Sequence, residues 1–196
     1  MASTVVDDRL TRSRLHLVIG ASALGFSVLY FVSDVWELVG GGFSGPQLVL
    51  TYLAEAAIPL FVLGLYAVQR PQIGVVGLWG AVGYAYAYIF FTGTVTIALV
   101  DRAADWDALV GDFGPWILIH GAVMVVAGTA FGGAAVMAGV LPRWTGTTLI
   151  VGVILVAVSE GLPGVVQVLA AGVRDLGSAG MGVALLAQGW ASAKKP

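Results

Sequence analysis

Five ionisable side chains lie inside long apolar stretches of the sequence, where a charge is costly and usually has a function or a partner. They are Asp34, Glu37, Glu55, His120 and Glu160. If these stretches are helices, a rise of about 1.5 Å per residue places all five within roughly 15 Å of one surface of a membrane. The sequence therefore predicts one layer of acids and imidazole in one half of the bilayer, and these five residues are the candidate catalytic groups.

Aromatic side chains accompany this layer at helical spacing. Tyr30, for example, precedes Asp34 by four residues, which puts both on one helical face. A face that carries an acid is expected to point toward protein or a cavity, because exposure to lipid would be expensive. Trp36 and Trp116 also fit the aromatic belt that lines membrane surfaces. The candidate substrate-binding residues are Tyr30, Trp36, Tyr52, Tyr84, Tyr88 and Trp116.

Length and composition identify the class of protein that carries these residues. The chain has 196 residues, of which 59% are hydrophobic and only 10% charged, whereas soluble domains carry about 25% charged residues. Zero cysteines exclude disulfides, iron–sulfur clusters and thiolate zinc sites, and two histidines cannot build a His-rich metal site. A net charge of −2 gives no sign of nucleic acid. We therefore expect a membrane protein with no cofactor, no metal and no nucleic-acid partner.

Six segments are long and apolar enough to span a bilayer as helices, which takes about 20 residues each. Glycine, proline and charged residues separate them, and the shortest break is a turn near the Arg174-Asp175 pair. The sequence thus predicts an all-α fold, a polytopic membrane helical bundle that forms a single transmembrane domain over residues 1–196. The predicted spans are residues 15–39, 47–69, 73–100, 114–140, 147–170 and 173–191.

The positions of Lys and Arg predict the orientation, because cytoplasmic loops carry an excess of them. With the N-terminus inside, only Arg102 and Arg174 of the nine basic residues would face outward. We expect both termini in the cytoplasm, the chain in the plasma membrane of a bacterium, and the acid layer in the outer half of the bilayer. The other seven basic residues are Arg9, Arg12, Arg14, Arg70, Arg143, Lys194 and Lys195.

In this assignment no Lys or Arg lies deep in a span, since Arg174 lies near a short turn. A site for phosphate or diphosphate would need such a cation. The predicted site is instead acidic, aromatic and otherwise apolar. Three chemistries suit it: protonation of a neutral lipophilic substrate, transport of protons or cations, and carboxylate-rich metal binding. The metal site ranks lowest, because the sequence has no Glu-x-x-His pair.

The Trp36-Glu37 pair, the chain length, the helical spans and the embedded acids resemble the small integral membrane terpene cyclases of meroterpenoid and indole-terpenoid pathways. The resemblance implies an enzyme that cyclises a neutral prenylated substrate after protonating it, with Glu37 as one acid and Glu55 or Glu160 as the other. Aromatic faces would stabilise the carbocation by cation–π attraction. This chain departs from the family by having six predicted spans where the family usually has seven, with its Trp-Glu pair in the first.

Two other functions remain open. Carboxylates inside the membrane are also typical of a proton- or cation-coupled small-molecule transporter, although only Gln69 and Gln188 are polar in the inner half. Alternatively, the acids satisfy one another in a non-enzymatic accessory or binding protein. A closed lipophilic cavity at the acid layer would favour the enzyme, and a water-filled path to the cytoplasm would favour the transporter.

Overall fold

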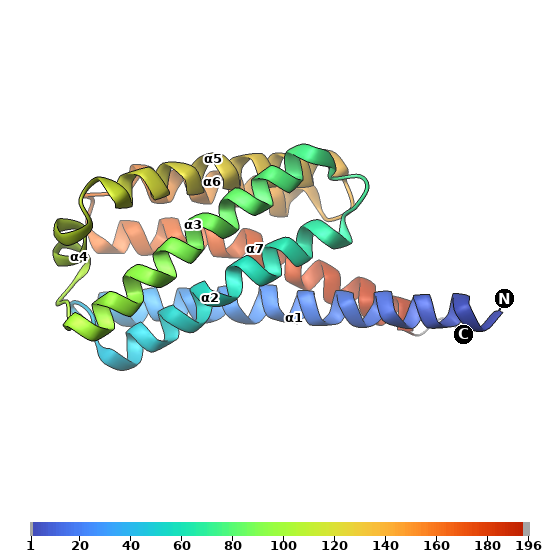
Figure 1. The fold of residues 1–196 in the computed structure, drawn as a ribbon, viewed down its shortest axis with the longest axis horizontal. Helices are drawn as coiled ribbons and strands as arrows, with labels where there is room; N and C mark the ends of the chain where they lie inside the picture. Colours follow the sequence, from blue (N-terminus) through green and yellow to red (C-terminus); the bar gives the residue numbers. More distant parts are fainter. Residues whose placement is uncertain (1, 194–196) are drawn as a thin grey trace.

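The computed structural model describes the backbone of residues 2–193 and the side chains of residues 13–191 except Asp112, and this part of the chain is all-helical, as predicted. Figure 1 shows the long helices lying side by side, with the start of α1 and the end of α7 at the same end of the bundle. We call the opposite end, which carries α4, the distal end. The helices are α1 (Ala2–Gly40), α2 (Gly45–Val68), α3 (Gly74–Asp101), α4 (Trp106–Phe113), α5 (Pro115–Ala138), α6 (Arg143–Val158) and α7 (Gly164–Ala193).

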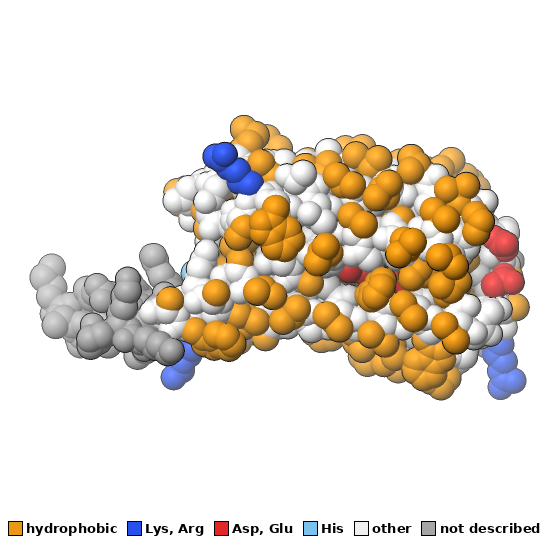
Figure 2. All heavy atoms as spheres, turned by 180° about the vertical axis from the view of Figure 1, so that it is seen from behind, with side chains coloured by type: hydrophobic (Ala, Val, Ile, Leu, Met, Phe, Trp, Pro, Cys, Tyr) orange, Lys and Arg blue, Asp and Glu red, His pale blue; other side chains and the backbone are white. Residues whose placement is uncertain are grey.

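Five helices are long and apolar enough to cross a membrane: α1 from Ser13, α2, α3, α5 and α7 up to Ala191. Large apolar side chains cover the sides of the bundle, and Figure 2 shows basic side chains at its two ends and acidic ones at the distal end. This distribution suits a protein whose sides contact lipid, which confirms a multi-pass membrane protein. The remaining long element, α6, has 16 residues and rises about 24 Å, less than the others.

The predicted boundary between the last two spans is wrong. α6 ends at Val158, and α7 runs without a break from Gly164 to Ala193. Between them Gly161 has a φ of 77°, a left-handed conformation that ends helices, and Pro163 lacks the N–H needed to continue α6. The Arg174-Asp175 pair, predicted to be a turn, lies inside α7.

The acidic loop predicted after α3 contains the short helix α4. The Oδ1 atom of Asp105 accepts a hydrogen bond from the Ala108 N–H at 2.9 Å and caps this helix. Leu109 of α4 is buried against the distal ends of α2 and α3 in a small apolar cluster separate from the main core. This packing fixes α4 across the distal end of the bundle.

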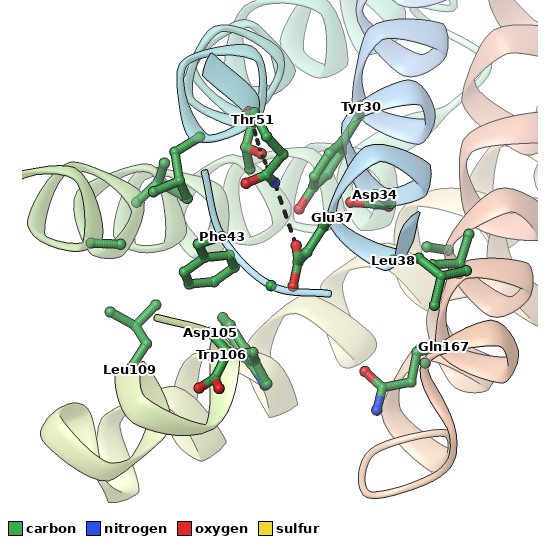
Figure 3. Close-up of a pocket in the computed structure, with 18 of the residues that line it drawn as sticks. Tyr30, Asp34, Glu37, Leu38, Phe43, Thr51, Asp105, Trp106, Leu109 and Gln167 are labelled. Atoms are coloured by element: carbon green, nitrogen blue, oxygen red, sulfur yellow. Dashed lines mark hydrogen bonds between the residues drawn. The ribbon is translucent and has the colours of Figure 1, made fainter. Parts of the chain in front are cut away.

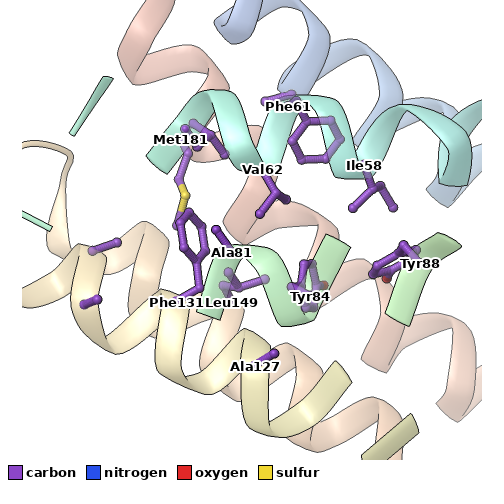
Figure 4. Close-up of a cluster of buried hydrophobic side chains, with 14 of the residues drawn as sticks. Ile58, Phe61, Val62, Ala81, Tyr84, Tyr88, Ala127, Phe131, Leu149 and Met181 are labelled. Atoms are coloured by element: carbon purple, nitrogen blue, oxygen red, sulfur yellow. The ribbon is translucent and has the colours of Figure 1, made fainter. Parts of the chain in front are cut away.

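The main core joins α1, α2, α3, α5, α6 and α7 through side chains such as Phe61, Phe131, Leu149 and Met181 (Figure 4). Where α6 crosses α7, a Cβ atom built on Gly152 would overlap the backbone N and Cα atoms of Arg174. The missing side chain therefore lets α7 approach α6 closely. This crossing fixes the position of α7 at Arg174.

We predict that Gly152→Ala lowers stability, by about 1–3 kcal/mol, because the added methyl group forces two helix backbones apart. The matched control is Gly133→Ala in α5, where a Cβ would meet no atom within 4 Å. The control should be neutral or stabilising, since alanine favours helices over glycine by about 1 kcal/mol. Thermal unfolding of both variants in detergent measures the difference, and equal effects would contradict the close crossing.

Candidate functional site

A pocket of about 440 Å³ occupies the distal end, between α1, α2, α3, α4, α6 and α7. We call Tyr30, Asp34, Glu55 and Arg174 its floor. They lie six to ten residues along their helices from the distal helix ends, or about 9–15 Å. Figure 3 shows Tyr30, Asp34 and Glu37 following one another along α1. Every residue that lines the pocket belongs to the distal half of the bundle.

Arg174 puts a buried cation at the floor, so the expectation that no Lys or Arg lies deep in a span is wrong. Its residue is only 5% exposed. The guanidinium donates two hydrogen bonds to the neighbouring Asp175, Nε to Oδ1 at 2.8 Å and Nη2 to Oδ2 at 3.2 Å. Nη2 also lies 3.9 Å from Asp34 Oδ2 on α1, and Cζ lies 4.5 Å from the Tyr30 ring centre. These contacts compensate the charge and let α7 continue as a helix.

Glu55 contributes a carboxyl group with one free oxygen. The residue is 4% exposed, and its Oε1 accepts a hydrogen bond from the Tyr30 hydroxyl at 2.7 Å. Its Oε2 is buried and has no partner among the described residues. Leaving a buried polar atom unpaired costs free energy, and this one belongs to a residue that lines the pocket. Glu55 therefore offers the pocket an acceptor when ionised and a donor when protonated.

A polar network beside the floor connects α1 to α2. The Gln47 side-chain Nε2 donates to Thr51 Oγ1 at 3.0 Å, to Ser33 Oγ at 3.2 Å and to Glu37 Oε2 at 3.4 Å. The hydroxyl groups of Ser33 and Thr51 bond to each other. Figure 3 shows the bonds that Glu37 and Thr51 make in this network. Gln47 is 1% exposed, and its Oε1, like Glu55 Oε2, has no partner among the described residues.

One side of the pocket is apolar, and a hydrogen bond between two side chains spans the mouth of the pocket. We call the side formed by Phe43, Leu48, Val95, Ala98 and Leu109 the apolar wall; all five line the pocket and belong to the distal apolar cluster. At the mouth, Trp106 Nε1 of α4 donates to Glu160 Oε1 at 3.1 Å. Glu160 is exposed in the turn between α6 and α7, so the expectation of a deep helical acid is wrong for this residue. It still lines the pocket, at the rim.

The pocket brings together Asp34, Glu37, Glu55 and Glu160 from the predicted catalytic set but not His120. The His120 side chain is buried between α3 and α5, with Nδ1 2.8 Å from the Trp116 carbonyl oxygen and Nε2 3.2 Å from the Tyr86 hydroxyl. Its ring stacks on Phe90 at 3.7 Å between centroids. Both ring nitrogens thus have partners, and the ring connects two helices outside the pocket.

Of the six predicted substrate-binding aromatics, only Tyr30 lines the pocket. Tyr84 and Tyr88 lie in the main core (Figure 4), where Tyr88 contacts the Tyr30 ring edge-on at 6.3 Å between centroids. Trp36, Tyr52 and Trp116 are 46%, 39% and 59% exposed and lie outside the pocket lining. Their exposure on apolar helices agrees with the alternative interpretation of Trp36 and Trp116 as belt residues.

Sequence reasoning missed Arg174, Gln47 and the apolar wall. A signal for Arg174 was present, because Gly161 followed by Pro163 is a helix stop. A stop at that point starts the last helix at residue 164 and puts Arg174 ten residues inside it. Gln47 and the apolar wall carry no comparable signal, since a glutamine at a helix start and scattered apolar residues are common in membrane proteins.

Comparisons of the chain with protein-family models, curated proteins and solved structures give no match. The chemistry of the pocket is therefore the basis for a function. Its features are a paired buried cation, two unpaired buried acceptors, an acidic rim and an apolar wall.

We predict that Arg174→Met destabilises the protein by about 3–5 kcal/mol, because it leaves buried carboxylates without their cation. The double variant Arg174→Met with Asp175→Leu should lose less, since it removes the bidentate pair as a unit. Unfolding in detergent, followed by helicity, measures the double variant and the single variants Arg174→Met and Asp175→Leu. A double variant as unstable as the sum of its two single variants would contradict the pairing of these side chains.

Proposed function

We propose that the protein is a membrane-embedded binding protein for a small organic cation, which enters the distal pocket from outside the cell. The observation that carries the proposal is the unpaired Oε2 of Glu55 at the pocket floor. The charge around it supports a cationic ligand, because Arg174 is the only basic residue among the described residues that line the pocket and is already paired. The acids that line the pocket are Asp34, Glu37, Glu55, Asp105, Asp107 and Glu160.

The acids fall into two groups with different effects. Asp105, Asp107 and Glu160 are exposed at the rim, where like charges around a concave surface raise the local concentration of cations. At the floor, Asp175 takes both short hydrogen bonds of Arg174, and Asp34 is 3.9 Å away. Asp34 and Glu55 thus retain capacity for a further cation or proton.

An organic cation suits this arrangement better than a metal ion. Within the described residues, no three His, Asp or Glu side chains gather closely enough to hold a metal. Calcium, by comparison, takes six to eight oxygen ligands at short distances. The acids here are distributed from floor to rim, and amide, hydroxyl and apolar side chains lie between them. A binding function is also favoured over a through-path, because the lining stays within the distal half.

We further propose six membrane spans in the plasma membrane, with the short α6 as the fifth and with both termini in the cytoplasm. The distribution of basic residues supports this orientation more strongly than the count from the sequence alone. With Arg174 inside the bundle, Arg102 is the one basic residue left for the outer surface. Of the seven expected inside, the side chains of Arg9 and Arg12 and both lysines lie outside the described residues.

The orientation can be tested directly, because the natural chain has no cysteine. We predict that Ala108→Cys, on the exposed face of α4, reacts with a membrane-impermeant maleimide in intact cells. Gln72→Cys, in the exposed turn between α2 and α3, should react only after the membrane is permeabilised. The reverse pattern would contradict both the orientation and the outward-facing pocket.

For the binding function, we predict that the purified protein binds butylammonium and not butyrate, since only the former complements the acids. Glu55→Gln should weaken butylammonium binding at least tenfold, which corresponds to about 1.4 kcal/mol. Asp101→Asn is the matched control, because Asp101 is an exposed distal carboxylate outside the pocket lining. Titration calorimetry measures both, and equal losses in the two variants would contradict a site at Glu55.

A second candidate is the acid-initiated cyclase, which the Glu55–Tyr30 pair supports. A protonated Glu55 held at one oxygen by Tyr30 could donate its proton from the other. Against it, Arg174 beside Tyr30 would repel a carbocation at that ring. The enzyme would convert a farnesyl-substituted phenol epoxide into a cyclic isomer of equal mass, with loss of activity in Glu55→Gln. Binding of butylammonium without such conversion would favour the binding protein.

A further inference from the structure

We propose that the ligand of the distal pocket is an amphiphilic amine: an ammonium group that carries N–H bonds at the floor, and an apolar body along the apolar wall. This inference rests on the proposed cation-binding function and adds the class of molecule. It depends on two separate features of the pocket, the unpaired acceptors and the position of the apolar wall.

The unpaired acceptors require hydrogen-bond donors. Glu55 Oε2 and Gln47 Oε1 are both buried, line the same pocket and have no partner among the described residues. The donors that lie nearest to them are already used, since Tyr30 donates to Glu55 Oε1 and Gln47 Nε2 donates within its own network. A primary or secondary ammonium carries two or three N–H donors, which are the groups that such unpaired oxygens require. A quaternary ammonium has none and would leave them unpaired.

The apolar wall indicates that the second half of the ligand is apolar. Leu48, Val95, Ala98 and Leu109 pack together with Phe43 in a cluster distinct from the main core. Figure 3 shows Phe43 and Leu109 on one side of the pocket and Gln167 on the other, with Glu37 between them. A ligand whose charge reaches the floor can place its remaining atoms along this wall.

Size agrees with a body of this kind. A cavity of about 440 Å³ falls within the usual range of roughly 300–1,000 Å³ for small-molecule sites. An alkylammonium of two carbons would leave much of that volume to water and most of the wall uncovered. A phenyl group joined to the amine by two carbons would cover apolar surface at the wall and keep its ammonium near Glu55, and aromatic bodies favour such contacts.

The test uses the full-length protein in lipid nanodiscs and four matched probes measured by calorimetry. They are 2-phenylethylamine, ethylamine, the quaternary N,N,N-trimethyl-2-phenylethylammonium and the neutral 2-phenylethanol. We expect 2-phenylethylamine to bind at least tenfold more tightly than each of the others. Empty nanodiscs and Glu55→Gln nanodiscs correct for partition of the probes into lipid.

Two variants locate the halves of the ligand. Phe43→Ala should remove most of the preference for the phenyl group and leave ethylamine binding unchanged. Glu55→Gln should weaken the binding of both 2-phenylethylamine and ethylamine. Leu60→Ala, a 76% exposed residue on the outside of α2, is the control and should change neither. Because Phe43 packs in the distal apolar cluster, helicity and thermal unfolding of its variant are measured alongside, to show that it is folded at the temperature of the titration.

The outcomes separate this inference from the proposed function. If ethylamine or the trimethylated analogue binds as tightly as 2-phenylethylamine, the amphiphilic amine is wrong and the cation site stands. If 2-phenylethanol binds as tightly, the apolar wall alone binds ligands and the charge requirement is wrong. If none of the four binds above the Glu55→Gln background, the proposed function fails together with this inference.

Discussion

Arg174 carries a positive charge about 15 Å into a membrane helix, and much of the distal half of the bundle is arranged to neutralise it. Asp175 on the same helix takes its two short hydrogen bonds, so α7 carries most of the compensation itself. Asp34 and Tyr30 on α1 add a second carboxylate and an aromatic face. Because α6 crosses the backbone of α7 at this residue through Gly152, three helices meet at Arg174.

The same neutralisation explains the character of the pocket. The floor contains more acid than its single cation requires, and two buried acceptors have no donor among the described residues. An apolar cluster held by α4 stands beside them. A pocket of this kind combines unsatisfied polar atoms at one end with desolvated apolar surface along one side. Polar atoms fix the orientation of a ligand, and apolar surface supplies area for its burial.

Much of the fold could be predicted, and the errors have physical causes. Hydropathy and length gave the all-helical membrane class, because any membrane-spanning backbone must satisfy its own hydrogen bonds. The last boundary failed because two adjacent charges were interpreted as a turn, although side chains of opposite sign can neutralise each other inside a helix. His120 was grouped with the acids by depth alone. Depth does not determine direction around a helix axis, and its ring points between α3 and α5.

The sequence by itself determined the class of protein, most helix bounds to within a few residues and three of the acids at the pocket, Asp34, Glu37 and Glu55. These follow from local composition and from the cost of polar groups in lipid. Only the tertiary structure decided that Arg174 joins them, that Glu55 keeps a free oxygen and that residues from α2, α3 and α4 form an apolar wall. Pairing and burial depend on which helices are neighbours and how each is rotated, and neither is encoded in any single apolar segment.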